Sequence, residues 1–148
     1  MSAPYCGMRA VLKAFQAKFD GSDLETLLDG GKLWPWGTPQ GIELPYVTVT
    51  PDDVAVEYTM GSGTTRMETI PVSFSVWLSL DTFTTVNVLE TTMNYYEALQ
   101  ALFDDCALDM SADGWSLLRM GRTGYFIGPD DDKGWQIRAD YELLIEEV

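Results

Sequence analysis

The stretch Arg66-Met-Glu-Thr-Ile-Pro-Val-Ser-Phe-Ser-Val-Trp-Leu-Ser-Leu80 decides the fold of this chain. Its apolar residues recur at every second position and form one face: Ile70, Val72, Phe74, Val76, Leu78 and Leu80. A period of two predicts a β-strand with one face in the core. Because strands usually have about five or six residues, we expect the part from Arg66 to Ile70 to project past the body of the domain.

The sequence before this stretch predicts two helices and short strands. An apolar stripe at helical spacing indicates an amphipathic helix from Gly7 to Phe19, and a capping pattern at Ser22 starts a short helix through Leu28. The segment Leu33–Gly41 is then predicted to be an edge strand or an ordered loop. Two strands are predicted after it, at Pro45–Thr50 and Val54–Met60.

The sequence after it predicts one main helix and three more strands. The helix begins near Thr82 to Thr85 and ends near Asp104, with an apolar stripe of Leu89, Met93, Tyr96, Leu99 and Phe103. The strands follow at Trp115–Met120, Gly124–Ile127 and Trp135–Ile145. This order predicts an α+β fold: a mostly antiparallel sheet with the main helix and the short N-terminal helical pair on one face. We expect residues 1–148 to form a single domain.

The net charge of −14 restricts the partners of the chain. Only nine basic residues are present, and they are scattered, so tight binding to nucleic acid is unfavourable. The acidity either serves solubility or lines a passage through which DNA slides without sticking. No apolar stretch approaches the roughly 20 residues of a membrane span, and the N-terminus lacks a secretion signal. We therefore expect a soluble protein of a cytoplasm, with Cys6 and Cys106 as reduced, mostly buried thiols.

The sequence predicts no enzyme, no metal site and no cofactor. It contains no histidine, which excludes the common nucleophile systems and removes the commonest zinc ligand. Asp130-Asp131-Asp132 superficially resembles a calcium loop, but strands flank it, so a hairpin turn is favoured. A small acidic hydrolase remains the alternative from another class, because paired carboxylates meet only in the fold.

Trp34 and Trp36 have two interpretations. They either cap the sheet edge as core residues or stand exposed as aromatic anchors of a protein interface, where tryptophan is enriched. A third function class, a small-molecule binding module, would use both tryptophans together with Tyr46.

The order of motifs resembles a known family. An N-terminal amphipathic helix leads to Leu33-Trp-Pro35, and a Pro-Gln-Gly turn precedes Leu44-Pro-Tyr-Val-Thr-Val49. The long strand feeds a single helix, and strands that begin with Gly114-Trp115 and Gly134-Trp135 close the chain. This pattern looks like the tail-terminator or tail-completion (neck) proteins of long-tailed bacteriophages. The threonine-rich start of the main helix departs from the family and puts that helix boundary in doubt.

The resemblance implies a structural virion protein without an active site. Such proteins form a ring, usually of six copies, that caps the head-proximal end of the tail tube and ends its polymerisation. The implied partners are other copies of the chain, the tail tube protein and the head-completion or neck proteins, while DNA passes through the lumen. The implied location is the neck of the virion, after assembly in the host cytoplasm. A head-completion protein and a tube subunit are the neighbouring alternatives.

A projecting strand end suits ring formation, because it can pair with the sheet edge of a neighbouring subunit. The predicted interface with a neighbour or the tube is therefore the start of the long strand and its approach: Met60, Gly61, Ser62, Gly63, Thr64, Thr65, Arg66, Met67 and Glu68.

Overall fold

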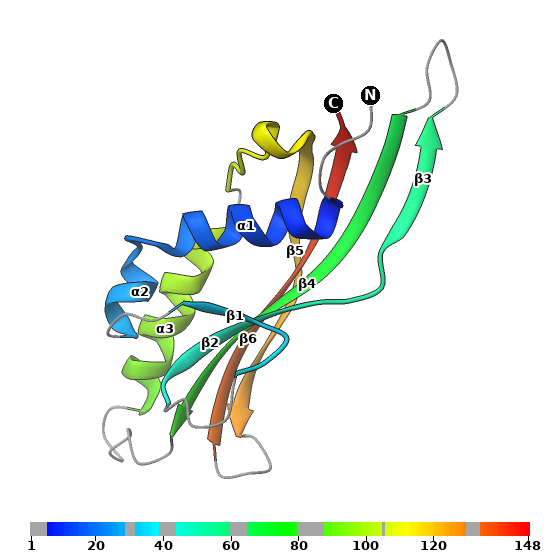
Figure 1. Ribbon diagram of the computed structural model, residues 1–148. Helices are drawn as coiled ribbons and strands as arrows, with labels where there is room; N and C mark the ends of the chain where they lie inside the picture. Colours follow the sequence, from blue (N-terminus) through cyan, green and yellow to red (C-terminus); the bar gives the residue numbers. More distant parts are fainter. Residues whose placement is uncertain are drawn as a thin grey trace.

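The predicted long strand is present as β4, Thr65–Ser79, in the computed structural model (Figure 1). The model describes residues 6–28, 32–38, 44–59, 65–79, 88–104, 106–129 and 134–148. Before β4 the chain forms α1 (Gly7–Phe19), α2 (Asp23–Leu27), β1 (Leu33–Pro35), β2 (Tyr46–Pro51) and β3 (Ala55–Thr59). After it come α3 (Val88–Phe103), the 3-10 turn η2 (Ser111–Asp113), β5 (Trp115–Pro129) and β6 (Gly134–Glu147). The predicted α+β class is confirmed.

The strands form one six-stranded sheet in the order β1-β2-β4-β6-β5, and β3 also pairs with β4. All pairs are antiparallel except β1 with β2, which is parallel. On one side of β4, β6 pairs from Met67 to Ser79. On its other side, β3 covers the first residues of β4 and β2 covers the last.

The start of β4, which we expect to project past the body of the domain, is not a lone strand end. From Met67 to Thr69, β4 is paired with β3 on one side and with β6 on the other. The ends of β3, β4 and β6 lie side by side in Figure 1. Of β3, β4 and β6, only β3 has an outer edge that no described strand covers, so at this end of the sheet the edge available to a neighbour belongs to β3.

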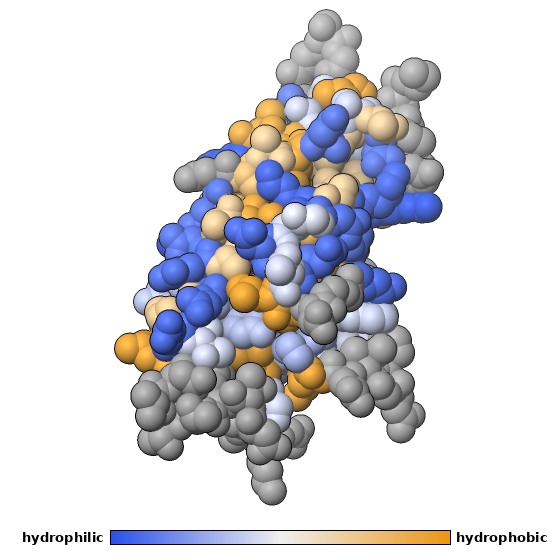
Figure 2. Space-filling model, turned by 90° about the vertical axis from the view of Figure 1, so that its left-hand side faces the viewer, coloured by the Kyte–Doolittle hydropathy of each residue, from blue (hydrophilic) through white to orange (hydrophobic). Residues whose placement is uncertain are grey.

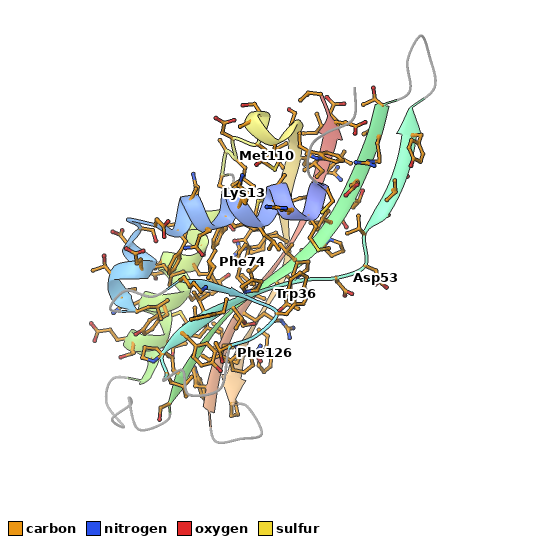
Figure 3. All side chains as sticks on the ribbon, viewed as in Figure 1. Lys13, Trp36, Asp53, Phe74, Met110 and Phe126 are labelled. Atoms are coloured by element: carbon orange, nitrogen blue, oxygen red, sulfur yellow. The ribbon has the colours of Figure 1, made fainter. Side chains whose placement is uncertain are left out.

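The core lies between the sheet and the helices, which pack on one face of it (Figure 1). Phe74 of β4 is at its centre (Figure 3). Its ring stacks on Phe103 of α3 at a centroid distance of 3.8 Å and meets Phe15 of α1 edge-on at 4.9 Å. Burial of side chains of this size stabilises the fold by about 1.5–3 kcal/mol each. The even-numbered face of β4 is therefore core, as the sequence predicts.

The buried face of α3 differs from the predicted stripe. Leu89 is 73% exposed, whereas Thr92 and Tyr95 are buried together with Leu99 and Phe103. The hydroxyl of Tyr95 donates to the carbonyl oxygen of Leu27 at 3.1 Å and so ties α3 to α2. The buried face of α3 thus includes Tyr95 with its hydrogen bond and leaves Leu89 outside. The predicted helix start at Thr82 to Thr85 lies outside the described residues.

The two strands predicted at Trp115–Met120 and Gly124–Ile127 are one strand, β5. Gly121 and Arg122, expected to form a turn, lie inside it and pair with β6. Register shifts between Leu117 and Arg119 and between Arg122 and Gly124 absorb the extra residues as bulges. Asp130 to Asp132 lie outside the described residues, but the strands that flank them pair antiparallel, as the hairpin prediction requires.

Neither cysteine forms a disulfide, as predicted. Cys6 is exposed rather than buried, because it precedes α1 at the surface, and Cys106 is half-buried. Among the described residues, no helix combines the length and apolar character needed to cross a membrane.

Candidate assembly surface

The predicted interface at the start of β4 is described only in part. Met60 to Thr64 lie outside the described residues, while Thr65 to Glu68 are the first four residues of β4. Arg66 contacts two carboxylates of its own chain, Glu68 at 3.4 Å and Glu147 at 3.5 Å. Its guanidinium also lies 5.0 Å from the centre of the buried Trp115 ring. Arg66 therefore fastens β4 to the end of β6 and the start of β5.

Glu68 is a buried carboxylate at the N-terminal end of α1. It is 9% exposed, and its Oε1 lies where a Cβ on Gly7 would approach to 2.6 Å. Burial raises the pKa of Glu68; Arg66 opposes this shift, and Glu147 adds to it. A side chain at position 7 would therefore require the Glu68 carboxylate and the Ile145 side chain to shift, and the glycine allows α1 to approach them closely.

The outer edge of β3 carries exposed apolar and acidic side chains. Val56 is 48% exposed and Tyr58 is 63% exposed, with the exposed Glu57 between them. Asp52 and Asp53, both exposed, lead into the strand. Large exposed apolar residues on an uncovered edge strand are unusual unless another chain covers them. This surface, residues 52–58, is called the β3 edge below.

The opposite edge of the sheet is formed by β5, which has the opposite charge. Residues 115–129 contain Arg119 and Arg122 and no aspartate or glutamate, although the whole chain has 23 acidic residues. Leu118, Tyr125 and Phe126 are 45%, 62% and 40% exposed. Arg119 lies 3.7 Å from Glu142 at the surface. This surface, the β5 edge, combines apolar exposure with a basic character.

The sheet face opposite the helices is polar and held by cross-strand hydrogen bonds. Trp77 donates from Nε1 to the Thr48 hydroxyl at 3.1 Å. Gln136 donates to the Ser75 hydroxyl at 3.1 Å. Asp140 accepts from the Ser73 hydroxyl at 2.7 Å and pairs with Arg138 at 3.2 Å. These bonds tie β2, β4 and β6 together without adding an apolar surface.

The two tryptophans of the Leu33–Gly41 segment differ. Trp34 is half-buried, with the Lys32 ammonium 4.3 Å from its ring centre. Trp36 is 59% exposed, so the anchor interpretation fits Trp36 better than the core one. Trp36 and Tyr46 both line a hollow of about 310 Å³ on the polar sheet face, but Trp34 does not. The three aromatic residues suggested for a small-molecule site are therefore not brought together.

The helical side of the molecule differs from the two sheet edges. In Figure 2, hydrophilic and apolar residues are interspersed over the coloured part of this side, and the apolar ones appear as separate patches. The described residues contain no group of three or more His, Cys, Asp or Glu side chains that could hold a metal ion. The sequence interpretation missed both sheet edges. The absence of acidic residues from positions 115–129 of a strongly acidic chain was the signal that could have indicated the β5 edge.

Comparisons with solved structures identify a similar fold. No protein-family model matches the sequence, and no curated protein matches it significantly. The fold is similar to that of a solved chain from a structure described as "Virion of native gene transfer agent (GTA) particle". The TM-score is 0.70 at 16% identity, over 96% of this chain and 98% of that chain. At this identity the likeness establishes a shared fold.

Proposed function

We propose that this chain is a structural component of a phage-like virion that forms a closed ring, of six copies, at the head-proximal end of the tail tube. There it would end tube polymerisation and offer a joining surface to the head-completion or neck proteins. The supporting observation is the fold shared with a chain of a gene transfer agent virion, which extends over nearly the full length of both chains. The order of motifs in the sequence, which resembles that of tail-terminator or tail-completion proteins, also supports the proposal.

The two sheet edges supply a means of closing the ring. They lie at opposite sides of the sheet order, and the β3 edge is acidic while the β5 edge is basic. A contact between the β3 edge of one copy and the β5 edge of the next is heterologous, and such contacts close into a ring by rotation. Unpaired strand backbone on each side provides hydrogen bonds, and the opposite charges set the pairing direction.

The proposed ring also gives the acidity of the chain a role. A net charge of −14 per copy would repel the phosphate backbone, so DNA would pass through the lumen without being held. On this proposal the chain acts by assembly, has no catalytic residues and resides in the neck of the virion.

The test is negative-stain microscopy of the purified chain, with its mass measured by light scattering. Closed rings of about six copies are expected. Long fibres would identify a tube subunit instead, and monomers at all concentrations would contradict the ring.

A matched pair of variants then tests the β3 edge. Tyr58→Lys places a charge on that edge and should reduce the assembly to monomers. Leu89→Lys changes an equally exposed apolar residue on α3 and should leave the ring intact. Circular dichroism confirms that both variants are folded. Equal effects of the two variants would exclude the β3 edge as the ring contact.

A further inference from the structure

An apolar groove runs between α1 and β1, and none of its described lining residues belongs to the β3 edge or the β5 edge. It has a volume of about 480 Å³, and its apolar lining residues are Met8, Leu12, Leu33, Pro35 and Val49. Cys6, Gln16 and Trp36 also line it. Polar groups in the lining are few, so water in this groove is easily displaced by an apolar side chain.

Trp36 stands at this groove in a constrained backbone conformation. Its φ of 62° is in the left-handed region, which non-glycine residues rarely adopt. Two hydrogen bonds fix the turn: Trp36 donates from its backbone N–H to Val49 at 2.8 Å, and Gly37 donates to Pro35 at 2.8 Å. The indole is nevertheless 59% exposed. Backbone strain that holds a large aromatic residue in solvent is typical of a recognition residue.

The rim of the groove is basic in a strongly acidic chain. Arg9, Lys13 and Lys32 line it, which is three of the nine basic residues, and none of the described residues that line it is acidic. Lys13, on α1 in Figure 3, pairs with Asp113 at 3.0 Å, and Lys32 lies over Trp34. The charged residues among the described lining of this groove are thus all basic, with Lys13 already paired to Asp113.

The edge of β1 beside the groove is not suited to accept another strand. Leu33 already donates its backbone N–H to the side chain of Gln16 at 3.1 Å, and Pro35 has no N–H. Alternate residues of a strand present their N–H groups on the same side. A ligand must therefore be held by side chains. The α1 residues that line the groove, from Met8 to Gln16, span about 13 Å, which accommodates two to three turns of helix.

We propose that this groove binds a short amphipathic helix of another protein, with an apolar face and acidic flanks. The apolar face enters the groove against Leu12 and Trp36, and the flanking carboxylates meet Arg9 and Lys32. This is the helix-in-groove mode of recognition. The inference does not depend on ring formation, because the groove lies within one copy.

The experiment measures binding of fluorescein-labelled model peptides to the purified full chain by fluorescence anisotropy. The probe is a helical peptide of about ten to twelve residues with leucines on one face and glutamates on both flanks. Two matched peptides replace the glutamates by lysine or the leucines by serine. The acidic peptide should bind at least about tenfold more tightly than either. The overall charge of −14 attracts the lysine peptide, so this preference must come from the rim.

Chain variants locate the site. The double variant Arg9→Glu/Lys32→Glu should weaken binding of the acidic peptide at least about tenfold. Lys18→Glu/Asn94→Asp/Ala101→Glu makes the same change in net charge outside the groove and should leave binding within about twofold. Trp36→Ala should weaken binding, and Leu89→Ala, which removes another large exposed apolar side chain, should not. Equal binding of the three peptides, or equal effects of the variants within either matched pair, would overturn the proposal.

Two other occupants give distinct results. If the chain without residues 1–5 binds the acidic peptide and the full chain does not, the groove belongs to the chain's own N-terminus and the proposal is wrong. If Arg9→Glu/Lys32→Glu abolishes self-association of the chain in the absence of peptide, a second copy of the chain occupies the groove. The proposal of a helix from another protein would then be wrong.

Discussion

Phe74 stacks on Phe103 with the ring centroids 3.8 Å apart and the ring planes 10° from parallel, which joins the middle of β4 to the last turn of α3. We expect Phe74→Leu and Phe103→Leu to destabilise the fold by about 1–3 kcal/mol each. Because the two rings contact each other, the double variant should cost less than the sum, with a coupling free energy of about 0.5–1.5 kcal/mol. Urea unfolding of the four proteins measures it. Strictly additive costs would show that the stacking contributes nothing beyond burial.

Tyr141 and Asp104 form a second link between the sheet and α3. The Tyr141 hydroxyl donates to Asp104, which also lies 3.6 Å from Arg122. Burial, together with the hydrogen bond to Asp104, raises the pKa of Tyr141 well above its usual value. Tyr141→Phe removes a hydrogen bond to a charged group and should cost about 1.5–3 kcal/mol. Tyr95→Phe removes a bond to a neutral carbonyl and should cost about 0.5–1.5 kcal/mol. The reverse order of the two unfolding free energies would contradict this account.

Gly7→Ala tests the close approach of α1 to β4. Alanine usually stabilises a helix relative to glycine by about 0.5–1 kcal/mol. At this position, however, the new Cβ would lie 2.6 Å from Glu68 Oε1 and 2.7 Å from Ile145 Cδ1. We therefore expect a net loss of about 1–3 kcal/mol. Gly121→Ala is the control, since its Cβ would have no neighbour within 4 Å. A thermal unfolding midpoint of Gly7→Ala at or above that of the wild type would refute the steric argument.

The raised pKa of Glu68 predicts a pH dependence of stability. In the folded chain Glu68 keeps its proton to a higher pH than in the unfolded chain. The folded state therefore binds more protons from about pH 4.5 upward, and stability falls as the pH rises through the folded pKa. The free energy of unfolding of Glu68→Gln minus that of the wild type should increase over this interval. Glu90→Gln, at an exposed position, controls for the loss of one negative charge from an acidic chain. A constant difference between Glu68→Gln and the wild type would contradict the shift.

The charge pattern of the two sheet edges can be tested by reversal. Glu57→Arg on the β3 edge and Arg119→Glu on the β5 edge should each weaken the proposed ring, because each places like charges opposite one another. The double variant restores one pair of opposite charges and should recover part of the assembly, as measured by light scattering at several salt concentrations. Additive weakening in the double variant would place the contact elsewhere.

Much of the fold follows from the sequence because its signals are local. The period-two faces of β4 and β6, the α1 stripe and the cap at Ser22 all depend on neighbours within a few residues. The Ser22 hydroxyl accepts from the Glu25 N–H, as the pattern predicts. Gly121 and Arg122 misled the interpretation, because a bulge and a turn use the same residue types. The distinction depends on the partner strand, which is far away in the sequence.

The parts that could not be predicted depend on long-range contacts. Leu89 and Tyr95 are both candidates for the buried side of α3, and the contacts that Tyr95 makes, including its bond to the Leu27 carbonyl oxygen, lie far away in the sequence. Asp104 is unfavourable at the end of a helix until Tyr141 and Arg122 are placed beside it. Arg66 seemed exposed because its carboxylate partner Glu147 is 81 positions away in the chain. The sequence therefore suggested a free edge on β4, whereas the structure shows that β3 pairs with this part of β4 and has the free edge itself.

The pairing of β4 on both sides also determines how the chain carries force. Its bonds to β6, from Met67 to Ser79, lie perpendicular to the strand axis. A pull along the strand loads all of these bonds together in shear, whereas a pull across it would open them one after another. Tension applied at the β3 end of β4 therefore spreads over the whole length of the sheet, and the molecule is mechanically stiff along that one direction.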